Sequence, residues 1–297
     1  MTTKSWQIER PGGRTVAVHE LTPDAPAGAP VVLLAHAAPG SGAFDPDPAA
    51  TVAAGVRLVA PDRPGYGGSD PVADGFATVD GAAGDAAAVL EALLEGGATA
   101  GVAGWSAGGR VALALAALRP ELVGAVAVVA TPAPDEEVPW YGDENRAATD
   151  GLRGLPPAEA RAGLAGMFGP MVEQLPPEAR LSLVADEGAD ARLLADADLS
   201  ARLRTMVDAA LAQGAVGTAD DVGGYSLAPW GFDPAGVRAP VLLGYGGADA
   251  LVPPAHGRWW ADRVPDARTE VVPDAGHLVV VPLWARVLAH LTGRPLD

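Results

Sequence analysis

Residues 99–118 read TAGVAGWSAGGRVALALAAL, and this stretch decides which fold the sequence predicts. Residues 99–103 form a short apolar run typical of a buried strand, whereas residues 109–118 repeat apolar side chains at helical spacing. The pentapeptide GWSAG, residues 104–108, separates the two. We therefore expect a strand, a sharp turn with Ser106 at its tip, and then a helix.

The two glycines of this pentapeptide suit such a turn. Strand and helix close in on positions 104 and 108, where a side chain would clash, and the turn forces Ser106 into a sparsely populated backbone conformation. The chain holds 38 glycines, so the pattern alone also arises by chance. Its strand–turn–helix context is what makes Ser106 a candidate nucleophile.

Strands and helices alternate along most of the chain. An antiparallel hairpin is expected where residues 6–9 and 15–21 flank two glycines. Further strands are expected at residues 31–35, 57–60, 125–130, 241–245 and 269–272, with helices at 76–93 and 283–291. This order predicts an α/β fold, in which helices cover both faces of a mostly parallel central sheet.

One long segment, residues 132–225, interrupts the alternation. It contains no clear buried strand, but it has helical patterns at residues 158–168 and 191–211. We interpret it as a helical cap insertion over the catalytic face, so that residues 1–131 and 226–297 form the core. The alternative is a run of ordinary crossover helices, which the length of the segment disfavours.

A serine hydroxyl needs a base, a carboxylate that orients the base, and donors that hold an oxyanion. Asp249 follows the strand at 241–245, and His277 lies in the loop after the strand at 269–272. The carboxyl ends of parallel strands share one edge of the sheet, so these side chains should meet there. We predict a triad of Ser106, Asp249 and His277.

Other residues compete for the same roles. Asp135 also follows a predicted strand and is the rival acid, whereas Asp274 is too close in sequence to His277 to reach around it. Three further histidines are expected to be surface or packing residues: His19, His256 and His290.

The composition limits the partners and the chemistry of the chain. Its 297 residues carry a formal net charge of −17, which argues against nucleic acid and anionic membrane surfaces as partners. There is no Cys, which excludes disulfides, thiol chemistry and thiolate metal sites. Residues 1–11 show no apolar leader, and no run of about 18 apolar residues stands out, so we expect a cytoplasmic protein.

The order Ser106, Asp249, His277 in these surroundings resembles the α/β-hydrolase superfamily, in its serine-nucleophile branch of esterases and prolyl aminopeptidase-like enzymes. Residues 60–70, APDRPGYGGSD, look like the loop after the fourth strand of that family. Residues 36–41, HAAPGS, look like its H-G-x-P-G oxyanion loop. The resemblance covers nearly the whole chain except the insertion.

The resemblance implies an oxyanion hole made by the backbone N–H groups of Ala38 and Ala107. Ala107 follows the nucleophile at a helix start, where N–H groups are free. The family usually has Gly where this chain has Ala37, so a positive φ there would strain the chain. His36 and Arg63 are expected to be structural.

The resemblance also implies an activity. We expect a serine hydrolase that cleaves a carboxylic ester of a small to medium apolar molecule through an acyl-enzyme on Ser106, with no metal or organic cofactor. Dehalogenases and epoxide hydrolases of this fold carry Asp at the turn instead. A peptidase or amide hydrolase like the prolyl aminopeptidases is the alternative, because acidic residues at 135–144 would bind a substrate amine. A non-hydrolytic lyase or ligand receptor also remains open.

Substrate choice should depend on the insertion, whose aromatic side chains either line a pocket or form the insertion's own core. We name four candidate pocket residues: Trp105, Trp140, Tyr141 and Phe168. The sequence does not indicate an oligomeric state.

Overall fold

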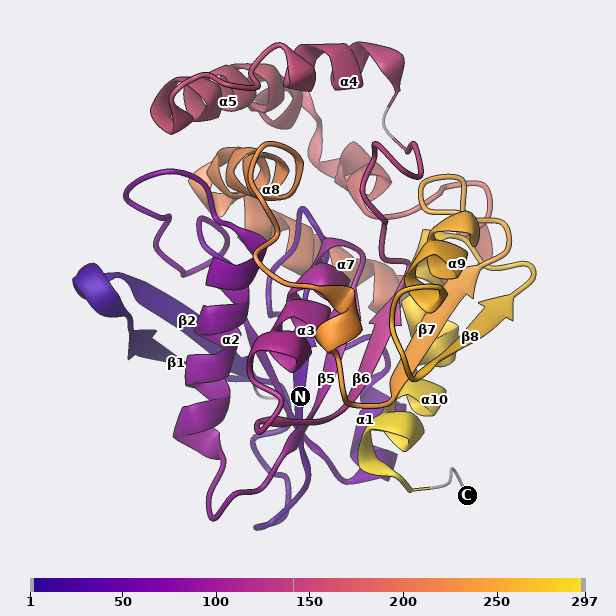
Figure 1. Cartoon of the computed structure of the whole chain (residues 1–297). Helices are drawn as coiled ribbons and strands as arrows, with labels where there is room; N and C mark the ends of the chain where they lie inside the picture. Colours follow the sequence, from indigo (N-terminus) through magenta and orange to yellow (C-terminus); the bar gives the residue numbers. More distant parts are fainter. Residues whose placement is uncertain (1–2, 141, 295–297) are drawn as a thin grey trace.

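In the part of the chain that the structure describes, eight strands form one sheet through the centre of the molecule (Figure 1). The computed structural model describes residues 3–140 and 142–294. The strand order across the sheet is β1-β2-β4-β3-β5-β6-β7-β8. The bounds are β1 Lys4–Glu9, β2 Thr15–Glu20, β3 Val31–Ala35, β4 Arg57–Pro61, β5 Ala100–Trp105, β6 Val123–Val129, β7 Val241–Gly246 and β8 Ala267–Val272.

The sheet is antiparallel at one side and parallel elsewhere. β1 and β2 form a hairpin, and β2 also runs antiparallel to β4. Every pairing from β4 to β8 is parallel. Parallel strands are covered on both faces, and every residue of β5 and β7 is buried. The mostly parallel sheet predicted from the sequence is therefore confirmed.

Helices cover both faces because alternate strand residues point to opposite sides. Leu33 belongs to an apolar cluster with α2 (Val79–Leu93) and α3 (Ala107–Leu118). Its neighbours Val32 and Leu34 belong to a second cluster, formed with α10 (Val280–Thr292). Helix α1 (Pro48–Ala54) packs on the same face as α10. Trp260 of α9 (Ala255–Ala261) packs on the same face as α3.

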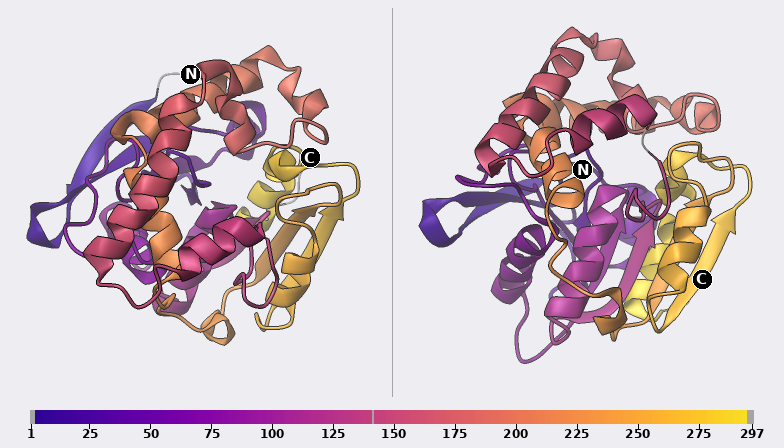
Figure 2. Two further views of the ribbon diagram at one scale, coloured as in Figure 1. Left: turned by 90° about the horizontal axis from the view of Figure 1, so that it is seen from above. Right: turned by 45° about the horizontal axis from the view of Figure 1, so that its top comes forward.

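Helices also fill the chain between β6 and β7. In the described part of this segment the α-helices are α4 Asp143–Asp150, α5 Pro157–Gln174, α6 Ala191–Leu194, α7 Ala197–Ala210 and α8 Val216–Ser226. We call residues 132–225 the cap segment. The pattern at 191–211 is two helices: α6 ends at Leu194, and Asp196 then caps α7 by accepting from the Leu199 N–H. Figures 1 and 2 show α4, α5 and α8 above the carboxyl ends of the parallel strands.

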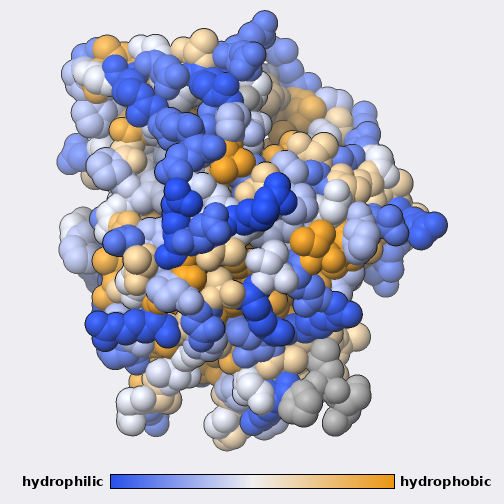
Figure 3. All heavy atoms as spheres, turned by 45° about the vertical axis from the view of Figure 1, so that its right-hand side comes forward, coloured by the Kyte–Doolittle hydropathy of each residue, from blue (hydrophilic) through white to orange (hydrophobic). Residues whose placement is uncertain are grey.

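The strand β8 at the open edge of the sheet carries charged side chains. This strand has exposed and half-exposed residues, including Arg268 and Glu270. Figure 3 brings this side forward and shows hydrophilic residues over most of the face, with apolar residues scattered among them. Charged side chains on an edge strand disfavour pairing with another chain. In the described ranges, 3–140 and 142–294, no helix has the length and apolarity needed to cross a membrane.

A buried carboxyl group ties the β3–α1 connection to α10. Asp45 Oδ1 accepts hydrogen bonds from Thr51 Oγ1 and from the Asp47 N–H, and Trp284 Nε1–H donates to Thr51 Oγ1 at 2.8 Å. Burial raises the pKa of Asp45 to about 6, although these hydrogen bonds and the charge of Arg202 oppose the rise. The folded state therefore prefers the protonated form, and ionisation costs stability.

Asp45→Asn should stabilise the protein at alkaline pH and leave its stability at acid pH nearly unchanged. Because the folded pKa exceeds the unfolded value, the wild type loses stability as pH rises through the interval from about 4 to 6. Chemical denaturation should show a gain of about 2 to 3 kcal/mol in the free energy of unfolding at pH 8 and little gain at pH 4. A gain that grows on acidification would contradict this account.

Candidate active site

The predicted turn between strand and helix is present at Ser106. β5 ends at Trp105, α3 begins at Ala107, and Ser106 between them has φ 53° and ψ −121°. Its N–H donates to the carbonyl oxygen of Val129 on β6 at 2.8 Å, which anchors the turn to the neighbouring strand. A non-glycine residue in such a conformation costs about 1 to 3 kcal/mol and persists only where its surroundings impose it.

Steric contacts explain both glycines of the pentapeptide. A Cβ on Gly104 would meet the backbone of Gly108 and Gly109, and a Cβ on Gly108 would meet the carbonyl oxygen of Ala35. These are backbone atoms, which cannot swing aside as a side chain can. Glycine at both positions therefore lets β3, β5 and α3 approach closely enough to hold Ser106 at the tip.

The structure brings His277 and Asp249 together. His277 Nδ1–H donates to Asp249 Oδ2 at 2.9 Å, and both residues are buried. Asp249 Oδ1 accepts from the N–H groups of Leu251 and Val252, each at 2.9 Å. Burial alone would raise the pKa of Asp249, but the hydrogen bond and charge of His277 hold it below its usual value. An ionised Asp249 keeps the proton of the ring on Nδ1 and leaves Nε2 as the basic nitrogen.

His277 also packs against the turn that carries Ser106. Trp105 Nε1–H donates to the carbonyl oxygen of His277 at 3.1 Å, and the two rings lie 6.0 Å apart between centroids. Trp105 is buried between His277 and Phe44. Within the described chain, no hydrogen bond joins Ser106 Oγ to the His277 ring; such bonds often form only when substrate binds.

The loop at His36 is held by hydrogen bonds to its carbonyl groups. The carbonyl oxygen of Ala37 accepts from His36 Nδ1–H at 2.7 Å and from Arg63 Nη2–H at 3.1 Å. Arg63 Nη1–H donates to the His36 carbonyl, and the Arg63 backbone N–H donates to His36 Nε2. Burial, helped by Arg63, lowers the pKa of His36 to about 3. His36 is therefore neutral and uses both ring nitrogens within the fold.

The condition for strain at Ala37, a positive φ, is not met. Among the described non-glycine residues, positive φ occurs at Ser106 and Ala130, so Ala37 lies outside the left-handed region. An alanine fits there without the backbone cost that a positive φ would impose. Ala38, the expected oxyanion donor, follows it in this loop, and Ala107 is the first residue of α3, where an N–H has no acceptor within the helix.

The rival residues lie elsewhere. Asp135 accepts from the Trp140 N–H and from Arg146. Asp274 is exposed, unlike the buried Asp249. The other histidines make separate contacts: His19 Nε2 with Asp62, His256 Nδ1 with the Ala133 N–H, and His290 Nε2 with the Val126 and Pro240 carbonyls.

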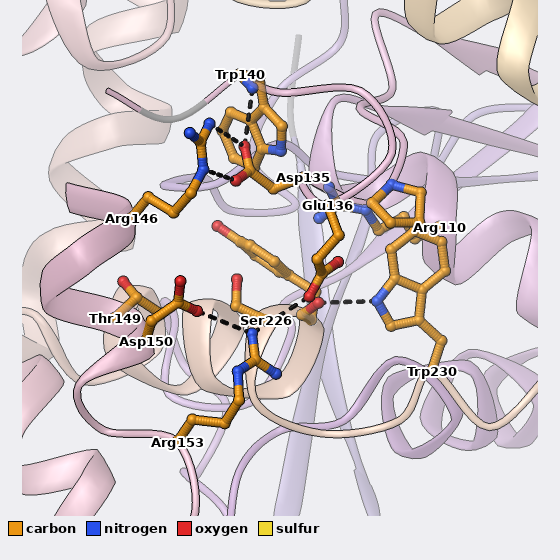
Figure 4. Close-up of a pocket in the computed structure, with 12 residues that line it drawn as sticks. Arg110, Asp135, Glu136, Trp140, Arg146, Thr149, Asp150, Arg153, Ser226 and Trp230 are labelled. Carbon is orange, nitrogen blue, oxygen red and sulfur yellow. Dashed lines mark hydrogen bonds and ion pairs between the residues drawn. The ribbon is translucent and has the colours of Figure 1, made fainter. Parts of the chain in front are cut away.

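A pocket lies between the cap segment and the core (Figure 4). Arg110 of α3, one turn after Ser106, reaches it, and the rings of Trp140, Tyr225 and Trp230 lie 4.3 to 5.8 Å from its guanidinium carbon. Ion pairs of Arg146 with Asp135 and of Arg153 with Glu136 and Asp150 also line the pocket (Figure 4). Ser106 itself does not line this pocket.

The four expected pocket residues have different places. Trp140 lines the pocket, whereas Trp105 is buried beside His277. Phe168 packs against the apolar cluster that joins α5 and α8. Tyr141 lies outside the described residues.

Two buried carboxylates of the cap segment were not found from the sequence. Asp190 Oδ2 accepts from the Leu278 N–H, next to His277, at 3.1 Å. Asp221 of α8 accepts from Arg63 Nη2–H at 2.6 Å and from Tyr66 O–H at 3.0 Å. Both contacts join residues far apart in the chain, and no local pattern marks them.

Gly108→Ala should test the steric basis of the turn. The new methyl group meets the Ala35 carbonyl, so we expect the free energy of unfolding to fall by about 1 to 3 kcal/mol in urea denaturation. Gly166→Ala is the matched control, because its Cβ on α5 meets nothing and should stabilise the helix by about 0.5 to 1 kcal/mol. Equal effects of the two substitutions would refute the steric explanation.

Comparisons with known proteins agree with this architecture. A family model described as the alpha/beta hydrolase fold matches residues 30–281. No curated protein sequence matches the chain closely enough to count as a relative.

Solved structures similar to this one span nearly the whole chain. A hydrolase from Pseudomonas aeruginosa PA01 is 22% identical, with 98% of each chain covered and a TM-score of 0.66. An esterase from Rhodococcus sp. ECU1013 is 21% identical, with 99% of this chain and 98% of that chain covered and a TM-score of 0.63. An enol-lactonase from Burkholderia xenovorans LB400 is 20% identical, with 95% and 98% covered and a TM-score of 0.67. At these identities the similarity shows the shared fold.

Proposed function

The chain belongs to the alpha/beta hydrolase family, and we propose that it is a serine hydrolase that cleaves a carboxylic ester of a small to medium apolar molecule through an acyl-enzyme on Ser106. One observation carries the proposal. The buried hydrogen bond between His277 and Asp249 lies at the edge of the sheet where the backbone of Ser106 is held at positive φ. A base with a fixed tautomer and a serine held at a sharp turn are what nucleophilic acyl transfer requires.

In this proposal Ser106 Oγ attacks the ester carbonyl carbon while His277 Nε2 takes its proton. The carbonyl oxygen becomes an oxyanion, held by the N–H groups of Ala38 and Ala107. Collapse of the tetrahedral intermediate expels the alcohol, which takes a proton from His277. Water then attacks the acyl group with His277 again as the base, and the carboxylic acid leaves Ser106 free. Asp249 stabilises the imidazolium in both halves.

Paired charges at the pocket favour an uncharged substrate over an amine. Asp135, Glu136 and Asp150 each pair with an arginine of α4 or of the α4–α5 connection. Glu137 pairs with Arg263 and accepts from Trp259 Nε1–H. Each of these carboxylates is therefore already paired with a cation of the protein, which disfavours a role in binding the amine of a substrate.

The test combines an active-site label with an ester series. Wild-type protein should react with a fluorophosphonate probe and hydrolyse p-nitrophenyl acetate, butyrate and octanoate. Ser106→Ala should abolish labelling and lower kcat by about 10³-fold or more. Ser182→Ala in the cap segment, whose hydroxyl donates to the Ala179 carbonyl at the surface, should change neither. Labelling that persists in Ser106→Ala would sink the proposal.

Asp249→Asn should separate the role of the carboxylate from its size. Asparagine favours the wrong tautomer of His277, so kcat for p-nitrophenyl butyrate should fall by about 10³- to 10⁴-fold with little change in KM. Asp274→Asn, at an exposed position in the loop that carries His277, should keep wild-type kinetics. A similar loss in both variants would argue against Asp249 as the partner of His277.

A further inference from the structure

Arg63 connects the oxyanion loop to the cap segment. On one side its guanidinium donates to the carbonyl oxygens of His36 and Ala37, at 2.8 and 3.1 Å. On the other side Nη2 donates to Asp221 Oδ2 on α8 at 2.6 Å. The side chains of Arg63 and Asp221 are only 4% and 11% exposed, so water screens their attraction weakly.

The Ala37 carbonyl matters because it shares a peptide group with the expected oxyanion donor. The C=O of Ala37 and the N–H of Ala38 belong to one planar trans unit, and they point in opposite directions. Fixing the carbonyl on Arg63 and on His36 Nδ1–H therefore fixes the direction of the Ala38 N–H. A charged donor on the carbonyl also polarises the peptide group and strengthens its N–H as a donor.

Helix α8 is packed firmly enough to hold this arrangement. Asp221 accepts a second hydrogen bond from the Tyr66 hydroxyl, and the Tyr66 ring packs edge-on against His36. A Cβ on Gly217 of α8 would collide with the Tyr66 ring. The loop that carries Arg63 and Tyr66 thus contacts α8 and the oxyanion loop at once.

We propose that Asp221 is a positioning residue for the oxyanion hole: through Arg63 it sets the Ala37–Ala38 peptide, so that the seating of α8 governs stabilisation of the transition state. This inference rests on the proposed function and deepens it. A substrate that presses α8 onto the core strengthens the oxyanion donor, whereas a ligand that lifts α8 weakens it. The effect falls on the transition state, where the oxyanion exists, and leaves ground-state binding alone.

The neighbouring residue supplies a matched control. Asp220 is also a buried carboxylate on α8, and it pairs with Arg161, which in turn donates to the Val72 carbonyl. Neither Asp220 nor Arg161 contacts the His36 loop in the contacts of the described chain. Asp220→Asn therefore perturbs the anchoring of the same helix without touching the oxyanion loop.

The experiment compares Asp221→Ala, Asp221→Asn and Asp220→Asn with the wild type on p-nitrophenyl butyrate. Loss of a whole oxyanion donor costs about 10²- to 10³-fold in kcat, so loss of its support in Asp221→Ala should cost about 10- to 100-fold. KM should stay within about twofold, and the affinity for a trifluoromethyl ketone, whose serine adduct carries an oxyanion, should fall in parallel. Asp221→Asn keeps an oxygen for Arg63, so its kcat should lie between those of Asp221→Ala and the wild type. Asp220→Asn should have the kcat of the wild type.

A double substitution tests whether Asp221 acts through Arg63. Arg63→Met should lower kcat more than Asp221→Ala, and the double variant should be no worse than Arg63→Met alone. Additive losses, or a loss of kcat in Asp220→Asn equal to that in Asp221→Asn, would overturn the inference.

Crystal structures of the wild type and the variants give a readout that does not depend on activity. The inference expects Arg63 to leave the Ala37 carbonyl and the 37–38 peptide to rotate in Asp221→Ala, and neither change in Asp220→Asn. A 37–38 peptide that keeps its wild-type orientation in Asp221→Ala would overturn this inference but not the proposed hydrolase activity. Absence of Ser106-dependent turnover in the wild type would overturn the proposed hydrolase instead. If Asp221→Ala does not fold, Asp221→Asn carries the same comparison.

Discussion

The site depends on a steric constraint at one residue. Ser106 stands at positive φ because Gly104 and Gly108 allow β3, β5 and α3 to approach without side chains between them. The same turn frees the first N–H of α3 and anchors the serine to β6. The His277 loop then packs on Trp105, the residue before the serine. Backbone geometry thus places Ser106, and hydrogen bonds hold His277 against Asp249 and Trp105.

The cap segment joins the core through buried carboxylates. Asp221 binds Arg63, which in turn binds the carbonyl groups of the His36 loop, and Asp190 binds the Leu278 N–H beside His277. Each buried acid is satisfied at least in part by a donor from the core, which offsets the cost of removing its charge from water. Because these contacts meet the loops that carry His36 and His277, the cap segment contributes to the geometry of both loops.

Short-range patterns predicted the fold well because each one encodes a local constraint. The run at 99–118 gave β5, the turn and α3, and Val31–Ala35 has the predicted bounds. Asp249 and His277 were placed by chain order at strand ends. Whether Ala37 has a positive φ, as the family's usual glycine allows, could not be told from the sequence; the structure shows that it does not. Arg63 was expected to be structural, but its partner Asp221 depends on a contact between residues 158 apart in the chain.

The central claim is that Ser106 carries the acyl group during turnover. The most direct measurement mixes the protein with p-nitrophenyl trimethylacetate, whose bulky acyl group leaves a serine slowly, then quenches with acid and analyses intact protein and peptides by mass spectrometry. The account predicts one trimethylacetyl group per chain, on the peptide that contains Ser106. Turnover of the ester with no adduct, or with the adduct on another residue, would contradict it.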